Sequence, residues 1–287
     1  MRLIETVDEM VAQREAWHKE GKTVGLVPTM GYLHQGHLSL AARSRLENDV
    51  TVASIFVNPL QFGPKEDFGR YPRNLERDLQ LLEAAGVGAV YNPAPAAMYP
   101  PGFEASVEVG GITDVLEGAI RPGHFKGVTT VVAKLFNTVG AQRAYFGQKD
   151  AQQVAVLRKM VRDLNFPVQL VVCPTFREPD GLAMSSRNVY LSAEERQVAP
   201  VLYRALQAAA HLWQTYPANR SGPALRKAML EVLGSASLGR PDYVSAADPL
   251  TLQEYDGPVS EDRGVLLSLA VRFGSTRLID NMPLEPR

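Results

Sequence analysis

Hydrophobic positions in the first 175 residues alternate between two patterns. Short segments that are apolar on both faces are separated by longer segments in which apolar residues recur at intervals of three and four. The first pattern predicts buried strands of a parallel sheet, and the second predicts amphipathic helices. The predicted strands are 23–29, 50–57, 87–91, 143–147 and 168–172, and the predicted helices are 6–19, 36–47, 73–85, 128–139 and 151–164. Because strands and helices alternate, residues 1–175 are predicted to form a Rossmann-like, doubly wound α/β domain.

The pattern changes after residue 175. A polar loop, FREPDGLAMSSRN, begins at Phe176 and is followed by two helical segments and then by three strand-like segments. The helical segments are 193–216 and 223–233, and the strand-like segments are 243–248, 264–273 and 276–280. Helices that precede a run of strands predict a smaller α+β domain over 176–287. Upstream, the proline-rich segment 92–102 is expected to be an extended surface loop.

Composition and charge narrow the possible partners. The 287 residues include 30 Lys and Arg against 31 Asp and Glu, which gives a net charge of -1. The chain therefore has no overall positive charge to attract nucleic acid or an acidic membrane. The single cysteine, Cys173, excludes an internal disulfide framework and favours a reducing cytoplasm. No apolar run approaches eighteen residues and the first twenty residues are charged throughout, so neither a membrane span nor a secretion signal is expected.

The strongest local signal is the string PTMGYLHQGH, residues 28–37, which follows the first predicted strand and opens a helix at about Gly36. Free backbone N–H groups and the positive end of the helix dipole meet at such a turn, where open α/β sheets bind ligands. His34 and His37 add side-chain donors, and Gly31 allows close approach of the backbone, so the turn favours phosphate binding. The pair could also be incidental polar residues or metal ligands, although no third ligand is evident.

Two further polar segments are ambiguous when taken alone. Lys149, in FGQKD after the strand 143–147, is either a phosphate-binding cation or a solvated surface charge. The segment MSSR, residues 184–187, offers hydroxyl donors and a planar cation to a phosphate, or is simply a flexible polar loop. No GxGxxG follows a strand, and GKT at 21–23 lacks the first glycine of a P-loop, so neither nucleotide fingerprint is indicated.

The strand-turn-helix segment with its HxGH sequence resembles the nucleotidylyltransferase superfamily. The longer string PTMGYLHQGHLSL resembles the pantoate–β-alanine ligase (pantothenate synthetase) family in particular. Further blocks follow in that family's order, and they are SIFVNPLQFGPKEDFGRYPR (54–73), RPGHFKGVTTVVAKLF (121–136), YFGQKDAQQ (145–153) and DGLAMSSRNVYLS (180–192). The five blocks cover most of the chain to about residue 200, whereas the C-terminal third adds little to the resemblance.

The resemblance implies an ATP-dependent, AMP-forming carbon-nitrogen ligase of pantothenate and coenzyme A biosynthesis. The pantoate carboxylate would attack the α-phosphate of ATP to give pantoyl adenylate and pyrophosphate, and the amine of β-alanine would then displace AMP to form pantothenate. Mg²⁺ is expected with ATP, held mainly by phosphate oxygens and water, so no protein metal ligand is predicted. The resemblance further implies a cytoplasmic homodimer in which the smaller domain closes over the active site.

The resemblance also implies roles for individual residues. Catalysis would fall to His34, His37, Lys149 and Arg187. ATP would be bound by Met30, Gly31, His34, His37, Gly147, Lys149, Asp150, Phe176, Met184, Ser185, Ser186 and Arg187. Pantoate would be bound by Gln61, Gln153, Asn58, Tyr71 and Arg121, with His124 supporting that wall and Gln61 also contacting β-alanine. Gln148 stands where the family usually has an acidic residue, and little consequence is expected because the Lys149–Asp150 pair is retained.

Two other functions are compatible with parts of the sequence. A nucleotidyltransferase that acts on a phosphate ester, such as a mononucleotide or phosphopantetheine, would share HxGH but would not explain Gln61 and Gln153 in their blocks. A nucleotide-binding regulatory module without catalysis is disfavoured because the cationic set of His34, His37, Lys149 and Arg187 is complete.

Overall fold

The structure is a computed structural model that describes residues 1–64, 66–260 and 262–286. The chain divides into two compact units. The first comprises Met1–Gly147 and Gln153–Pro174, and the second comprises Gln148–Gln152 and Thr175–Arg287. The five residues 148–152 therefore cluster with the C-terminal part of the chain, although their position in the sequence predicts that they belong to the first domain.

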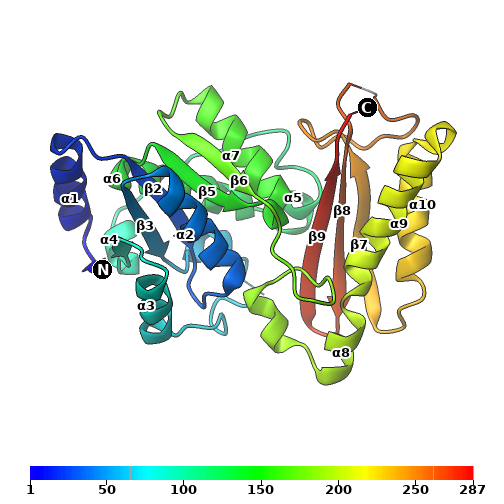
Figure 1. The fold of residues 1–287 in the computed structure, drawn as a ribbon, viewed down its shortest axis with the longest axis horizontal. Coiled ribbons are helices and arrows are strands. Elements are labelled where there is room, and N and C mark those ends of the chain that lie inside the picture. The colour runs from blue at the N-terminus through cyan, green and yellow to red at the C-terminus, as the bar shows by residue number, and fades with distance from the viewer. Residues whose placement is uncertain (65, 261, 287) are drawn as a thin grey trace. The chain divides into compact units, whose positions relative to one another are not determined.

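A parallel sheet of six strands forms the centre of the first unit, in the order β1-β4-β3-β2-β5-β6 (Figure 1). The strands are β1 (Arg2–Ile4), β2 (Val24–Thr29), β3 (Val50–Ile55), β4 (Ala89–Tyr91), β5 (Arg143–Gly147) and β6 (Gln169–Cys173). The chain runs outward from β2 through β3 to β4 and then returns to place β5 on the other side of β2. This reversal makes the carboxyl ends of β2 and β5 the topological switch point, where sheets of this kind bind ligands.

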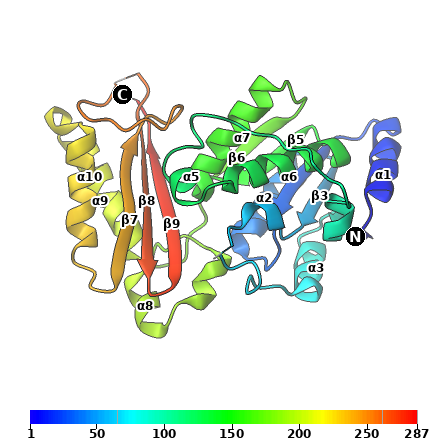
Figure 2. The same cartoon turned by 180° about the vertical axis from the view of Figure 1, so that it is seen from behind.

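Helices cover both faces of this sheet. On one face α2 (Gln35–Glu47) contacts β2, β3 and β5, with α3 (Leu75–Ala84) beside it, and α2 lies in front of the sheet in Figure 1. On the other face lies α6 (His124–Val139), which contacts α1 (Val7–Lys19) and β2 and is in front in Figure 2. The shorter elements are η1 (Pro59–Gln61), α4 (Pro95–Met98) and α5 (Glu117–Ile120). A longer helix, α7 (Ala151–Asp163), precedes β6. The doubly wound fold is confirmed.

Several boundaries differ from the predicted ones for identifiable reasons. The predicted helix 193–216 is two helices, α8 (Ala193–Val198) and α9 (Val201–Thr215), because Pro200 has no N–H to continue the ladder. The segment 92–102 is not wholly an extended loop, since α4 forms within it and buries Met98 completely. Strand β1 was missed because its three residues, of which two are exposed, carry no readable period.

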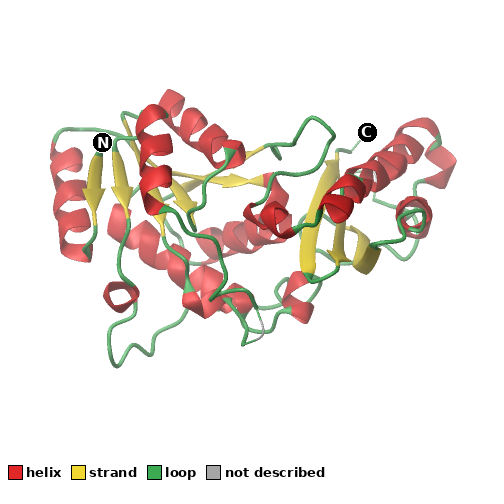
Figure 3. Ribbon diagram, turned by 90° about the horizontal axis from the view of Figure 1, so that it is seen from below, coloured by secondary structure: helices red, strands yellow, loops and turns green. Residues whose placement is uncertain are grey.

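The second unit packs two helices on a small antiparallel sheet (Figure 3). The sheet has the order β7-β8-β9, with β7 (Gly239–Ala247), β8 (Val265–Phe273) and β9 (Thr276–Leu284). Helix α9 contacts β8 and β9, and α10 (Gly222–Leu233) contacts β7 and α9. The core of the unit is formed mainly by leucines and other apolar side chains of these five elements, among them Leu206, Trp213, Met229, Leu267 and Leu269. This confirms the predicted α+β organisation.

Within the described part of the chain, every helix is too short or too polar to cross a bilayer.

Candidate active site

The turn between β2 and α2 is held by hydrogen bonds to its backbone. Gly31 and Tyr32 have φ angles of +81° and 49°, in the left-handed region that glycine adopts most readily. The Thr29 hydroxyl accepts from the Gly31 N–H at 3.1 Å. The buried carboxylate of Asp78, on α3, accepts from the N–H groups of Tyr32 at 2.6 Å and Leu33 at 2.8 Å. The turn is therefore tied both to the strand that enters it and to the neighbouring helix.

The two histidines of the turn cap helix α2. Nδ1 of His34 accepts from the Gly36 N–H at 3.2 Å, and Nδ1 of His37 accepts from the His34 N–H at 3.3 Å. This is the reciprocal arrangement of a capping box, built here from imidazoles. Because Nδ1 accepts in both rings, each neutral imidazole carries its proton on Nε2. The side chains are thus caps and Nε2–H donors at once, and the ring centroids lie 4.0 Å apart.

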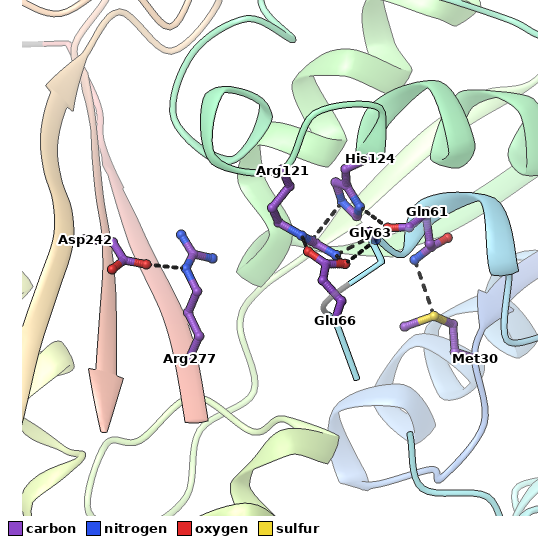
Figure 4. A network of polar contacts seen from close by, with 8 residues as sticks. All are labelled: Met30, Gln61, Gly63, Glu66, Arg121, His124, Asp242 and Arg277. Carbon is purple, nitrogen blue, oxygen red and sulfur yellow. Dashed lines mark hydrogen bonds and ion pairs between the residues drawn. The ribbon is translucent and has the colours of Figure 1, made fainter. Parts of the chain in front are cut away.

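A second polar cluster surrounds Gln61, at the end of η1. The Asn58 side chain, only 1% exposed, donates to Gln61 Oε1 and to the Gly127 carbonyl, each at 3.1 Å. Asn58 Oδ1 accepts from the Tyr99 hydroxyl at 2.7 Å. Since Gln61 Oε1 is used as an acceptor, the amide orientation is set, and Nε2 points to Met30 Sδ at 3.3 Å (Figure 4). Gln61 therefore presents N–H donors on the side of Met30.

Arg121 lies within the same cluster and pairs with Glu66 (Figure 4). Its guanidinium donates to the two carboxylate oxygens of Glu66 at 2.5 and 2.8 Å and to the Gln61 carbonyl at 3.4 Å. His124 Nε2 lies 3.1 Å from Arg121 Nη1, and His124 Nδ1 donates to the Gln61 carbonyl at 2.8 Å. Burial and the adjacent Arg121 charge lower the pKa of His124 to about 4, so the ring is neutral at physiological pH.

The other two predicted pantoate residues lie outside these hydrogen bonds. Tyr71 is buried, with its ring centroid 5.9 Å from that of Phe62, and Gln153 is half-buried in the first turn of α7. The structure thus joins Asn58, Gln61 and Arg121 through direct contacts.

In the second unit, the predicted phosphate residues occupy two segments. Lys149 lies in η2 (Gln148–Asp150), just after β5, and its Nζ is 3.6 Å from the Asp150 carboxylate. The side chain of Lys149 is 21% exposed, against 46% for Asp150. Gly147, the last residue of β5, faces open space where a side chain would stand. Lys149 therefore lies two residues beyond Gly147, the last residue of β5.

The MSSR segment follows a short hairpin. The Met184 N–H donates to the Phe176 carbonyl at 2.9 Å, which closes the hairpin. Ser185 caps η3 (Ser186–Tyr190), because its hydroxyl accepts from the Arg187 N–H at 3.2 Å. Ser186 is buried and Phe176 is 42% exposed. These hydrogen bonds give the segment a defined turn.

Sequence reasoning missed two residues that hold the predicted site in place, Asp78 and Asn281. Asp78 could have been noticed, because an acidic residue four positions before the buried Leu82 interrupts the apolar face of α3. Asn281 gave no comparable signal, since it follows Asp280 in β9 and its contacts are with residues more than 130 positions away. Long-range pairs of this kind have no local pattern.

No group of three or more His, Cys, Asp or Glu side chains that could hold a metal ion occurs among residues 1–64, 66–260 and 262–286. The side chains predicted to meet the phosphates are N–H and O–H donors. Such donors suit phosphate oxygens.

Comparison with known proteins identifies similar chains over the whole length. A sequence profile described as pantoate-beta-alanine ligase matches residues 2–283. The pantothenate synthetase of Roseiflexus castenholzii is 58% identical over 285 residues, which are 99% of this chain and 100% of that protein. The crystal structure of pantothenate synthetase from Thermus thermophilus is 52% identical, with a TM-score of 0.92 and 100% coverage of both chains. The Francisella tularensis pantoate-beta-alanine ligase, complexed with beta-gamma ATP and beta-alanine, is 32% identical with a TM-score of 0.80 over 99% of this chain and 97% of that one.

Proposed function

Because the chain belongs to the pantoate–β-alanine ligase family, we propose how its own side chains carry out the two steps of that family's reaction. The chain is an ATP-dependent ligase that joins pantoate to β-alanine through pantoyl adenylate and releases pyrophosphate and AMP. Each step develops negative charge on phosphoryl or carbonyl oxygens, so fixed donors and cations are the groups that lower the barrier.

The observation that carries the proposed adenylation chemistry is the tautomer of His34 and His37. Nδ1 of His34 and of His37 accepts a backbone N–H, so both rings offer Nε2–H donors at the N-terminus of α2. In the first step these donors stabilise the phosphoryl oxygens of ATP while the pantoate carboxylate attacks the α-phosphorus. Lys149 and Arg187 neutralise the charge that passes to the departing pyrophosphate, and the remaining ATP-binding residues predicted above shape the nucleotide site.

Gln61 is proposed as the main pantoate ligand. Its Oε1 is held by Asn58, so its Nε2–H groups are the ones that meet a carboxylate or hydroxyl oxygen. Asn58 and Arg121, which were also expected to bind pantoate, have their polar groups engaged by Tyr99, Gly127 and Glu66. We therefore assign to Asn58 and Arg121 the positioning of Gln61. Gln153 and Tyr71 remain direct pantoate contacts in this proposal.

In the second step the amine of β-alanine attacks the acyl carbon of pantoyl adenylate, and the bond to the phosphate oxygen breaks as AMP leaves. Gln61 is proposed to contact β-alanine as well, because a carboxylate oxygen is a stronger acceptor for its Nε2–H groups than the thioether sulfur of Met30. Water must be excluded at this stage, since it would hydrolyse the adenylate.

Mg²⁺ is proposed to enter with ATP. In this proposal the ion is held mainly by phosphate oxygens and water, where it would neutralise charge on the phosphates. We also propose that the enzyme works in the cytoplasm, consistent with one buried cysteine and no disulfide, and as a homodimer. Sedimentation of the purified chain tests the last point.

The test of the function is pantoate-dependent exchange of labelled pyrophosphate into ATP, with Mg²⁺ present and β-alanine omitted. Exchange is expected, because adenylation is reversible and precedes the arrival of the amine. Replacing pantoate by a mononucleotide or phosphopantetheine should abolish it. Exchange with a phosphate ester in place of pantoate would instead support a nucleotidyltransferase. If exchange is absent and AMP does not form even after β-alanine is added, the pantoate assignment fails.

A further inference from the structure

Asn281, on β9, makes three hydrogen bonds to the segment that carries Lys149. Its Nδ2 donates to the carbonyl of Gln148 at 2.9 Å and to the carbonyl of Lys149 at 2.8 Å. Its Oδ1 accepts from Gln148 Nε2 at 3.0 Å. The side chain is only 4% exposed, so water cannot easily replace these partners. All of the contacts lie within the second unit.

The strand position of Asn281 is itself fixed by its neighbour. The buried Asp280 accepts from the Asn281 N–H at 2.8 Å and from both terminal nitrogens of Arg177, at 2.6 and 2.9 Å. The Arg177 guanidinium also stacks on the Tyr203 ring, 4.0 Å from its centroid. A bidentate, buried pair of this kind restricts both members to one geometry, so β9 offers a rigid base for the Asn281 amide.

The η2 turn needs such a base. A 3₁₀ turn of three residues has few internal hydrogen bonds, and a lysine side chain has four rotatable bonds, so the ammonium position depends on where the backbone is anchored. Gln148 adds a second constraint, because its Nε2 donates to Asn281 Oδ1. This hydrogen bond disfavours a flip of the Asn281 amide that would direct Oδ1 at the two carbonyl oxygens. The donors of Asn281 thus remain aimed at Gln148 and Lys149.

We propose that Asn281 is a positioning residue for the adenylation step and that it acts through Lys149. This inference rests on the function proposed above, in which Lys149 binds phosphate. Asn281 touches neither ATP nor pantoate in this scheme. Its amide fixes the backbone of Gln148 and Lys149, and thereby the distance between the Lys149 ammonium and the phosphate oxygens. A displacement of a reacting or charge-stabilising group by about 1 Å costs on the order of a hundredfold in rate.

A double-mutant cycle tests the inference. The rates of pantoate-dependent pyrophosphate exchange are measured for the wild type, Lys149→Ala, Asn281→Ala and the double variant. Lys149→Ala should lose roughly two to three orders of magnitude. Asn281→Ala should lose about tenfold to thirtyfold in the wild-type background but less than about twofold in the Lys149→Ala background, because residues that act as a unit are non-additive. The KM for pantoate should stay within about twofold, since Gln61 is not disturbed.

Arg226→Ala is the matched control. It also removes a hydrogen-bonded side chain of the second unit, paired with Glu254 at 2.6 Å, but it lies on α10 beside β7, at the opposite sheet edge from β9. Its exchange rate should be unchanged. Should Asn281→Ala fail to unfold cooperatively, Gln148→Ala takes its place in the cycle, with an expected loss of about twofold to fivefold that again vanishes without Lys149.

The outcomes separate the two proposals. Wild-type protein that shows no pantoate-dependent exchange overturns the proposed function and this inference with it. Wild-type exchange combined with equal losses from Asn281→Ala in both backgrounds, or with a loss below about twofold in the wild-type background, overturns this inference alone.

Discussion

Histidine serves this protein in two opposite tautomers. His34 and His37 use Nδ1 to accept backbone N–H groups and so keep their protons on Nε2, whereas His124 donates from Nδ1 to a carbonyl and receives Arg121 at Nε2. Sequence alone could not assign these protons, because the partners are backbone atoms and a side chain whose positions depend on the fold. The first two rings can therefore donate to a ligand, while the third holds the Gln61 turn.

The double role of His34 can be separated by substitution. His34→Asn keeps a side-chain acceptor for the Gly36 N–H, and His34→Ala removes it. Both variants lose the Nε2–H donor, so both should lose about a hundredfold or more in exchange rate. Only His34→Ala should also lose about 1 kcal/mol in free energy of unfolding, measured by urea titration. Equal stability of the two variants would show that the cap contributes nothing.

His124 predicts a pH dependence of stability. Its pKa is about 4 in the folded protein and about 6.5 in an unfolded chain, so between these values the unfolded chain binds a proton that the folded protein does not. The free energy of unfolding therefore falls as the pH falls through this window, by up to about 3 kcal/mol.

The matched variant is His124→Gln, which cannot be protonated but can still donate to the Gln61 carbonyl. Between pH 7 and pH 5, urea unfolding of the wild type should lose about 2 kcal/mol more than unfolding of this variant. The same pH slope in both proteins would rule out His124 as the source.

At the scale of elements, the close approach of α6 to η1 shapes the pantoate side of the site. Gly127 lies in α6 directly against the backbone of Leu60, and its carbonyl accepts from Asn58. A Cβ at position 127 would overlap the Leu60 carbonyl and lie 2.6 Å from the Gln61 nitrogen. Only glycine allows the helix and the turn to meet at this distance.

Gly127→Ala should therefore displace η1 even though alanine favours a helix by about 1 kcal/mol over glycine. The KM for pantoate should rise about tenfold or more, because η1 carries Gln61, while the KM for ATP stays within about twofold. Gly110→Ala, where a side chain would meet open space, is the control and should leave both values unchanged. A parallel rise of both KM values for Gly127→Ala would indicate general disruption instead.

Much of the element pattern could be predicted from the sequence because burial leaves a periodic trace. Strands such as β2 and β3 are apolar on both faces, and the HxGH turn follows β2 in a block that resembles a known family. The partners in the contacts that fix the site left no such trace, even where Asp78 interrupts the apolar face of α3. Asp78 and Asn281 hold backbone groups 45 and 132 positions away, and the sequence gives no distance between such segments. The break at Pro200 could have been predicted, since proline interrupts a helix.

At the scale of the whole molecule, the proposed catalytic groups are shared between the two units. His34, His37 and Gln61 belong to the first unit, and Lys149 and Arg187 belong to the second. The boundary at 147/148 thus assigns Lys149 to the same unit as Arg187, although the two residues are far apart in the sequence. In the proposed reaction, Lys149 and Arg187 of the second unit both contact the phosphates of ATP.

Ligand binding should therefore protect the segment around Arg187 from trypsin. With ATP, Mg²⁺ and pantoate present, cleavage after Arg187 should slow by about fivefold or more, because the phosphate holds the guanidinium and the bound state is stabilised by mass action. Cleavage after Lys22, in the turn that follows α1 and outside the proposed ligand set, should not change. Equal slowing at both sites, or at neither, would count against a phosphate role for Arg187.

The anchoring of Lys149 by β9 has a consequence for synthesis of the chain. The bond between Asn281 and Lys149 spans 132 positions, whereas the bonds of Asp78 to the HxGH turn span 45 and 46. At about 5–20 residues per second, a ribosome needs roughly 7–26 s after translating Lys149 to reach its anchor. The nascent protein can therefore complete its histidine turn early, while the lysine stays unplaced until the last strand emerges. Adenylation competence should be among the final properties that the growing polypeptide acquires.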